Sequence, residues 1–126
     1  MDLDITVWIL LALALLMVKH CFIDFFDQNS EEISRKGKYG DLLGMWHSIK
    51  HGIATMGIFA IMGDSLLGGI ILGFLDFSIH YHVDWIKQNY ANQSPTTPQF
   101  WRAIGLDQLV HQLTYLLLVW MTVAQV

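Results

Sequence analysis

Four long apolar stretches follow one another along the chain. They cover residues 5–26, 42–62, 66–86 and 103–123. At a rise of about 1.5 Å per residue, a helix of this length crosses a hydrocarbon core of about 30 Å. The pattern therefore predicts four membrane-spanning helices.

Polar segments separate these stretches and indicate how the helices connect. Residues 27–41 and 87–102 form two polar loops, and Pro95 and Pro98 interrupt helical structure in the second loop. The second and third spans meet at a very short turn around Gly63, Asp64 and Ser65. Such connections favour neighbours that run in opposite directions. We therefore expect an all-α fold, an up-down-up-down antiparallel four-helix bundle that forms a single domain over residues 1–126. Two glycine pairs have the spacing of close helix contacts, which chance would also produce: Gly40 with Gly44, and Gly69 with Gly73.

Composition supports a membrane protein rather than a soluble one. The 126 residues are 54% hydrophobic and 14% charged, about half the charged share of a typical soluble domain, and the mean hydropathy is +0.44. A net charge of −4 leaves no basic surface for nucleic acid, and a single Cys excludes an internal disulfide. Asp2 and Asp4 precede the first span where a signal peptide would carry basic residues, so we expect this span in the mature protein.

The basic residues and the tryptophans predict an orientation. All seven basic residues lie at or near the ends of the spans that face the two long loops: Lys19, Arg35, Lys36, Lys38, Lys50, Lys87 and Arg102. The positive-inside rule places this end in the cytoplasm and both termini outside. Trp8 and Trp120 then mark the outer interface, and Trp46, Trp85 and Trp101 the inner one.

A polar stripe recurs near the cytoplasmic end of each span. Its members are four residues apart, which places them on one helical face. They are His20 and Asp24, His47 and His51, Asp76, His80 and Asp84, and Asp107 and His111. His82 lies two positions from His80 and faces away. An ionised carboxylate as deep as Asp76 costs about 2.5–3.5 kcal/mol, which paired charges, water or a cation must offset.

The residue types in the stripe favour a divalent cation. Imidazole and carboxylate ligands without thiolates suit Zn²⁺, Mn²⁺ or Fe²⁺. Nine residues exceed the four ligands of a closed zinc site, so we expect one or two cations, and favour two. Five of the nine are expected to be inner ligands: Asp76, His80, Asp84, Asp107 and His111. The other four complete or support the site. The alternative is a set of histidines that only join helices by hydrogen bonds.

Further polar side chains adjoin the stripe. Lys50, Lys87 and Arg102 lie at span ends, where they either reach the membrane interface or hold a substrate phosphate. Three others are candidates for orienting the ligands: Gln28, Gln108 and Tyr115.

The chain resembles an uncharacterised family of small polytopic membrane proteins of bacteria and their phages, known as a domain of unknown function. The resemblance rests on four segments in order: KHCFIDFFDQ, WHSIKHG, DFSIHYHVDWIK and GLDQLVHQLTY. The family pattern is matched at His20, Asp24, His47, His51, His80, Asp84, Lys87, Asp107, Gln108 and His111. More remotely, the chain is similar to bacterial membrane-bound metal-dependent hydrolases. The resemblance implies a bound metal and a multi-pass protein of the bacterial inner membrane.

These features predict an integral membrane protein whose cytoplasm-facing metal centre hydrolyses a phosphoester or pyrophosphate of a lipid or another amphiphile. The cation would lower the pKa of a bound water to about 7, and a non-ligand His or Asp would act as general acid or base. Two alternatives stay open. One is a path for cations or protons, for which the outer half offers few polar residues unless a homo-oligomer lines a pore. The other is a purely structural metal in a protein that acts through partners.

Overall fold

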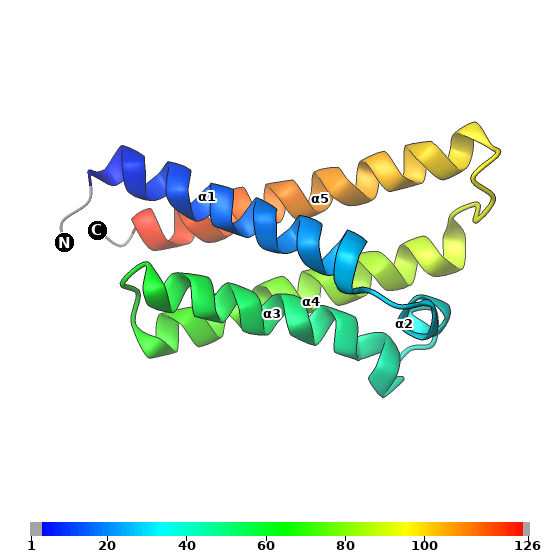
Figure 1. Cartoon of the computed structure of the whole chain (residues 1–126), viewed down its shortest axis with the longest axis horizontal. Coiled ribbons are helices and arrows are strands. Elements are labelled where there is room, and N and C mark those ends of the chain that lie inside the picture. Colours follow the sequence, from blue (N-terminus) through cyan, green and yellow to red (C-terminus); the bar gives the residue numbers. More distant parts are fainter. Residues whose placement is uncertain (1–3, 125–126) are drawn as a thin grey trace.

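The computed structural model describes residues 4–124, and all regular structure in that range is helical (Figure 1). Four long helices alternate in direction along the chain, and both described ends lie at the same end of the bundle. The helices are α1 (Ile5–Phe22), α3 (Leu42–Ile61), α4 (Leu66–Tyr90) and α5 (Pro98–Val123). The predicted all-α class is confirmed. Asp2, with the rest of residues 1–3 and 125–126, lies outside the described residues.

Both predicted loops contain more helix than expected. The segment between α1 and α3 holds a π-helical turn (Ile23–Asp27) and the short helix α2 (Ser30–Arg35). Helix α4 continues to Tyr90 and α5 begins at Pro98, so the non-helical linker covers only residues 91–97 and is shorter than the predicted loop at 87–102. Pro98 can start a helix because the N–H groups of the first helical turn have no partners within the helix. The backbone N–H that proline lacks is therefore not missed at this position.

The α-helices begin at residues whose side chains accept backbone hydrogen bonds, which the first turn of a helix otherwise lacks. These residues are Asp4, Asn29, Asp41, Ser65 and Thr97. The hydrogen bond from the Gly44 N–H lowers the pKa of the Asp41 carboxyl below its ordinary value. The sequence therefore specifies where the helices start.

Helices α3 and α4 approach each other closely through two glycines. A Cβ atom on Gly73 would lie 2.5 Å from the Gly52 carbonyl oxygen, and one on Gly52 would lie 2.7 Å from that of Gly73. Gly73 belongs to one of the two glycine pairs noted above. In the other pair, Gly44 meets the Arg35 backbone, whereas Gly40 lies in a turn with φ of +80° and makes no close contact.

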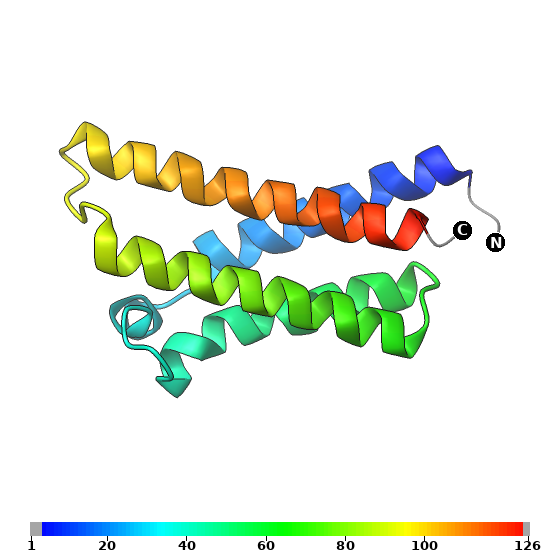
Figure 2. The same ribbon diagram turned by 180° about the vertical axis from the view of Figure 1, so that it is seen from behind.

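The interior divides into two halves along the bundle axis. The apolar half, toward the termini and the turn at residues 62–65, is filled by a cluster that includes Leu16, Phe59, Leu72, Tyr115 and Leu118. The polar half lies toward α2 and the 91–97 linker, which joins α4 to α5 at the far end of the bundle (Figure 2). The stripe predicted from sequence lies in this half.

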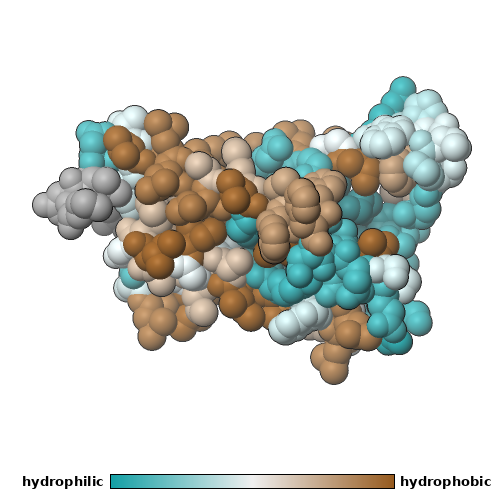
Figure 3. Space-filling view, in the orientation of Figure 1, coloured by the Kyte–Doolittle hydropathy of each residue, from teal (hydrophilic) through white to brown (hydrophobic). Residues whose placement is uncertain are grey.

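Two helical segments are long and apolar enough to cross a membrane by length and composition, Ile5–Asp27 and Leu66–Tyr90. Helices α3 and α5 do not meet this criterion. Each carries polar side chains inward, which lowers its hydropathy. The structure therefore bears out two of the four predicted spans as candidates. Hydrophobic residues cover much of the visible face, and hydrophilic residues gather toward the end with α2 (Figure 3).

Candidate metal centre

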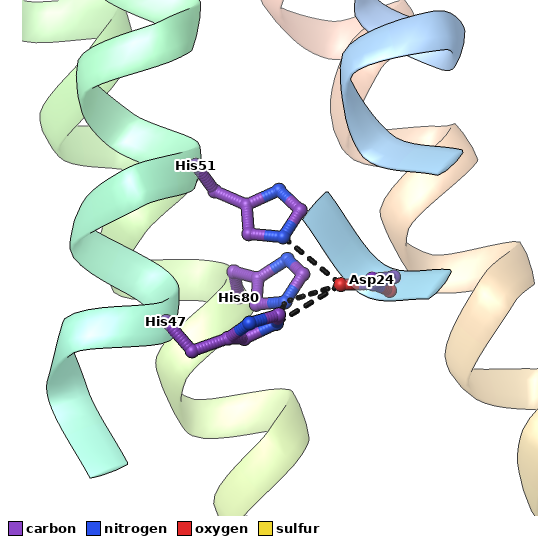
Figure 4. Close-up of side chains that lie close together, drawn as sticks. All are labelled: Asp24, His47, His51 and His80. Carbon is purple, nitrogen blue, oxygen red and sulfur yellow. Dashed lines mark hydrogen bonds and ion pairs between the residues drawn. The ribbon is translucent and has the colours of Figure 1, made fainter. Parts of the chain in front are cut away.

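Asp24 lies at the centre of the polar half, on the π-helical turn that follows α1. Its Oδ1 atom is 2.9 Å from His47 Nε2, 2.9 Å from His51 Nε2 and 3.6 Å from His80 Nε2 (Figure 4). The three imidazoles, from α3 and α4, are buried. π-Helical turns are rare and often occur at functional sites. This turn brings one carboxylate to three imidazoles.

The separations between these ligand atoms are close to those of a tetrahedral cation site, and three of them are shorter. Bonds of about 2.0–2.2 Å place neighbouring ligand atoms about 3.3–3.6 Å apart. The Nε2 atoms of His47 and His80 are 3.1 Å apart. Two N–H groups cannot face each other at this distance, so at least one of these nitrogens offers a lone pair. Small outward shifts of the side chains would admit a cation.

A second cluster shares His80 with the first. His80, Asp84 and His111 each offer one atom to a group whose ligand atoms all lie within 4.8 Å of one another. His80 Nε2 is 3.4 Å from Asp84 Oδ2, and the His80 and His111 rings are stacked with centroids 4.0 Å apart. All three side chains are buried. Three protein ligands leave a coordination position for another group, as catalytic zinc sites do.

His20 was predicted as a ligand but has both nitrogens occupied. Gln108 donates to Asp107 Oδ2, which turns its amide oxygen toward His20 Nε2 at 2.9 Å. Nε2 therefore carries the proton, and Nδ1 accepts from the Tyr115 hydroxyl at 2.8 Å. The same Nε2 lies 3.1 Å from Asp24 Oδ2. His20 thus orients Asp24, and Gln108 and Tyr115 orient His20.

Asp76 lies deeper than either cluster and belongs to neither. Its Oδ2 atom accepts from Lys19 Nζ and from the Thr55 hydroxyl, both at 2.5 Å. Lys19 Nζ also lies 3.2 Å from His51 Nδ1. A buried ion pair therefore offsets the cost of burying this carboxylate, where the sequence had suggested a metal.

Two further lysines reach the centre. Lys36 Nζ lies 2.7 Å from Asp84 Oδ2. Lys87 Nζ lies 2.9 Å from Asp107 Oδ2 and 3.4 Å from Asp84 Oδ1. Asp107 Oδ1 is in turn 3.3 Å from His111 Nε2. Asp107 therefore adjoins the second cluster beside a lysine rather than inside the cluster.

The remaining predicted residues lie at the edge. Lys50 pairs with Asp27 and Glu32, which holds the π-helical turn against α2. Arg102 is exposed near the start of α5. Gln28 donates to the Asp24 backbone carbonyl at 2.8 Å.

Sequence reasoning assigned no role in the site to Lys19, Thr55 or Lys36. Lys19 was detectable, since it interrupts an apolar run one residue before His20. Lys36 was not, because nothing in a polar loop indicates that one lysine folds back and becomes buried.

Comparison with known proteins gives a family but no activity. A family profile described as "Protein of unknown function (DUF3307)" matches residues 12–126, which include every residue of both ligand clusters. The comparisons with curated proteins and with solved structures found no match. The match covers nearly the whole chain, and the protein therefore belongs to the DUF3307 family of proteins of unknown function.

Proposed function

We propose that this protein is a metal-dependent hydrolase of the bacterial inner membrane that cleaves a phosphoester or pyrophosphate of a lipid-like amphiphile at the cytoplasmic face. The observation that carries the proposal is the environment of Asp24. Within residues 4–124, its carboxylate pairs with histidines and with no lysine or arginine. A largely buried carboxylate whose partners are imidazoles rather than ammonium groups is well placed to hold a cation.

The charge of the polar half also favours cations. Its network contains four carboxylates, Asp24, Asp76, Asp84 and Asp107, and three ammonium groups, Lys19, Lys36 and Lys87. All are buried except Asp24 and Lys87, which are partly exposed. With neutral histidines the network carries a net charge of −1. One divalent cation would change this to +1. Two would change it to +3, so a second cation would need an anionic ligand such as hydroxide or phosphate beside it.

Sharing of His80 suggests how two cations would divide the ligands. Assigned to the second cluster, His80 leaves Asp24, His47 and His51 as a first set. Both sets then consist of two histidines and one carboxylate. Such a triad leaves coordination positions open for water and substrate. If His80 instead joined Asp24, the four ligands would close a structural site.

The proposed reaction needs a base as well as ligands. When bound, the cations would supply Lewis acidity and lower the pKa of water toward about 7. Water forms a bond to phosphorus while the bond from phosphorus to the ester oxygen breaks. Asp107, which adjoins the second triad without belonging to it, accepts a proton from water. Asp107 then gives this proton to the departing alkoxide, so the products are the phosphate and an alcohol and Asp107 is again a carboxylate.

The distribution of side chains supports placement in a bilayer. Among the described residues, fourteen polar or charged side chains are buried and only ten hydrophobic ones, while large hydrophobic side chains such as Leu10, Phe26 and Leu106 are exposed. This arrangement suits lipid rather than water as the surroundings. The apolar half, filled by tightly packed side chains such as Phe59 and Leu118, disfavours a conducting path through one chain.

Metal content of the detergent-purified protein tests the proposal. We expect about two atoms of Zn, Mn or Fe per chain, falling to about one in His111→Ala and in His51→Ala. His82→Ala is the matched control, because His82 is exposed on α4 and bonds to Tyr39 outside the clusters. Release of phosphate from dodecyl phosphate should accompany the metal and be lost in His111→Ala.

Two outcomes would overturn this function. A single atom per chain that survives in His111→Ala would indicate a closed structural site made by Asp24 and three histidines. A metal-free protein, after purification without chelators, would leave only a hydrogen-bonded network.

A further inference from the structure

A groove of about 450 Å³ runs between the end of α4 and the start of α5. Its walls include Val83, Ile86 and Tyr90 of α4 and Ala103, Leu106 and Val110 of α5. The volume lies within the range of small-molecule sites, and the walls are almost entirely apolar. The groove is therefore suited to a hydrocarbon chain.

Two polar residues of the metal centre form the inner side of this groove. Lys87 and Asp107 both line it, and their Nζ and Oδ2 atoms are 2.9 Å apart. Beyond them lies His111, whose Nε2 atom is 3.3 Å from Asp107 Oδ1. The groove is thus separated from the second ligand cluster by a single side chain.

With a cation bound at the centre, the charge at the inner side favours an anionic head group, because Asp107 by itself balances Lys87. Lys87 is largely buried, with 23% of its side chain exposed, yet it contributes an ammonium group to the groove. The adjoining network would be positive with either one or two divalent cations bound. Phosphate is the anion that both a lysine and hard or borderline cations bind well. A cationic head group would meet Asp107 but would be repelled by Lys87 and by a bound cation, and a neutral head group would gain neither contact.

The outer side of the groove is open to the surroundings of the bundle. Ile86, Leu106 and Tyr90 are 52%, 64% and 77% exposed. An amphiphile could therefore enter sideways from a bilayer with its chain along these residues. The head would reach Lys87 without the chain crossing the packed interior.

We propose that this groove binds the hydrocarbon chain of a phosphate-bearing amphiphile and presents its head group to the metal centre beside Lys87. The inference rests on the proposed function for the role of the head group, and it names where the substrate lies. It also explains why an apolar groove ends at an ion pair.

Photolabelling of the whole protein in nanodiscs tests this binding site. The probes are a twelve-carbon alkyl phosphate and the matching alkyl trimethylammonium, each with a diazirine at the chain end. We expect the phosphate probe to label residues 83–90 and 103–110 at least about five-fold more than the ammonium probe. Ala103→Phe, which fills the groove, should reduce this labelling by about ten-fold. Leu109→Phe is the matched control on the same helix, because Leu109 is exposed and does not line the groove.

The outcomes separate this inference from the proposed function. Equal labelling of the metal-loaded protein by both probes, or labelling unchanged in Ala103→Phe, would show ordinary lipid contact and overturn the binding site even if phosphate release is observed. Labelling by both probes that Ala103→Phe removes, in a protein that proves metal-free, would support the chain-binding groove and overturn the phosphate preference. Loss of labelling in Leu109→Phe as complete as in Ala103→Phe would also contradict it.

Discussion

At the scale of single residues, the polar half pairs nearly every buried charge with an opposite one. The ion pairs are Lys19 with Asp76, Lys36 with Asp84, and Lys87 with Asp107. Asp24 is the exception, since histidines are its partners. This difference sets Asp24 apart from the carboxylates that lysines already neutralise. Asp84 has both kinds of neighbour, since it pairs with Lys36 and also lies in the second cluster. Residue type and depth alone do not distinguish them.

Asp76 provides the sharpest test of this distinction. Asp76 is paired with Lys19 and Thr55. We therefore expect the Asp76→Asn variant to retain the bound metal, whereas the sequence predicted Asp76 as a metal ligand. Lys19→Met should lower the free energy of unfolding by about 3–5 kcal/mol, since it leaves a buried charge unpaired. Denaturant unfolding in detergent, with metal analysis of the folded protein, measures both effects.

Lys38→Met is the control for Lys19→Met, because Lys38 is exposed in the segment after α2. The double variant Lys19→Met, Asp76→Asn should regain part of the lost stability, as removal of both charges leaves neither unpaired. Loss of metal in Asp76→Asn as complete as in His51→Ala would return Asp76 to the ligand set.

At the scale of elements, the pairing of α3 with α4 sets the positions of three of the ligands. Gly52 and Gly73 let the two backbones approach, and His47 and His51 of α3 then face His80 of α4 across the contact. The third element is the π-helical turn after α1, which carries Asp24 to these histidines. The ligand geometry therefore depends on one close helix contact and one irregular turn.

Gly73→Ala should separate α3 from α4. The added Cβ atom would lie 2.5 Å from the Gly52 carbonyl oxygen, which belongs to the backbone and cannot turn aside. We expect a loss of about 1–3 kcal/mol in the free energy of unfolding, with weakened metal binding. Gly57→Ala on α3 is the control, because a Cβ atom there meets nothing within 4 Å. That variant should be neutral or slightly more stable. Equal effects of the two changes would show that the close contact does not matter.

At the scale of the whole molecule, the bundle is polar inside at one end and apolar outside over much of its surface. The basic residues lie in or near the polar half, which holds α2 and the 91–97 linker. Lys36 and Lys19 are nevertheless buried there, so fewer basic groups face the surroundings than the sequence suggests. The proposed orientation therefore rests mainly on Arg35, Lys38 and Arg102.

Cysteine labelling tests this orientation. In a Cys21→Ser background, Thr96→Cys should react with a membrane-impermeant maleimide only when the cytoplasmic face is accessible. Asp64→Cys, in the turn between α3 and α4, should react from the opposite face. Reaction of both from one side would contradict a bundle that spans the membrane, and the reverse pattern would invert the orientation.

The sequence alone predicted the helices, through their apolar stretches, and the histidine and aspartate side chains of the stripes, through their spacing. Residues four apart on a helix share a face whatever the helix packs against, so the stripes and the polar half they form could be read from the chain. Capping side chains such as Asp41 and Ser65 likewise act on their own helix. The loop boundaries were less accurate, because Pro98 is compatible with both a break and a start of a helix.

Only the tertiary structure decided which members of the stripe meet. His20 and His51 belong to equivalent stripes, yet His20 bonds to Gln108 and Tyr115 while His51 faces Asp24. The choice depends on the π-helical turn, on the contact between Gly52 and Gly73, and on Lys19 and Lys36 reaching carboxylates from distant segments. Such pairings join residues far apart in the chain. Local sequence therefore determines which chemical groups are offered, and packing between helices determines which of them form a site.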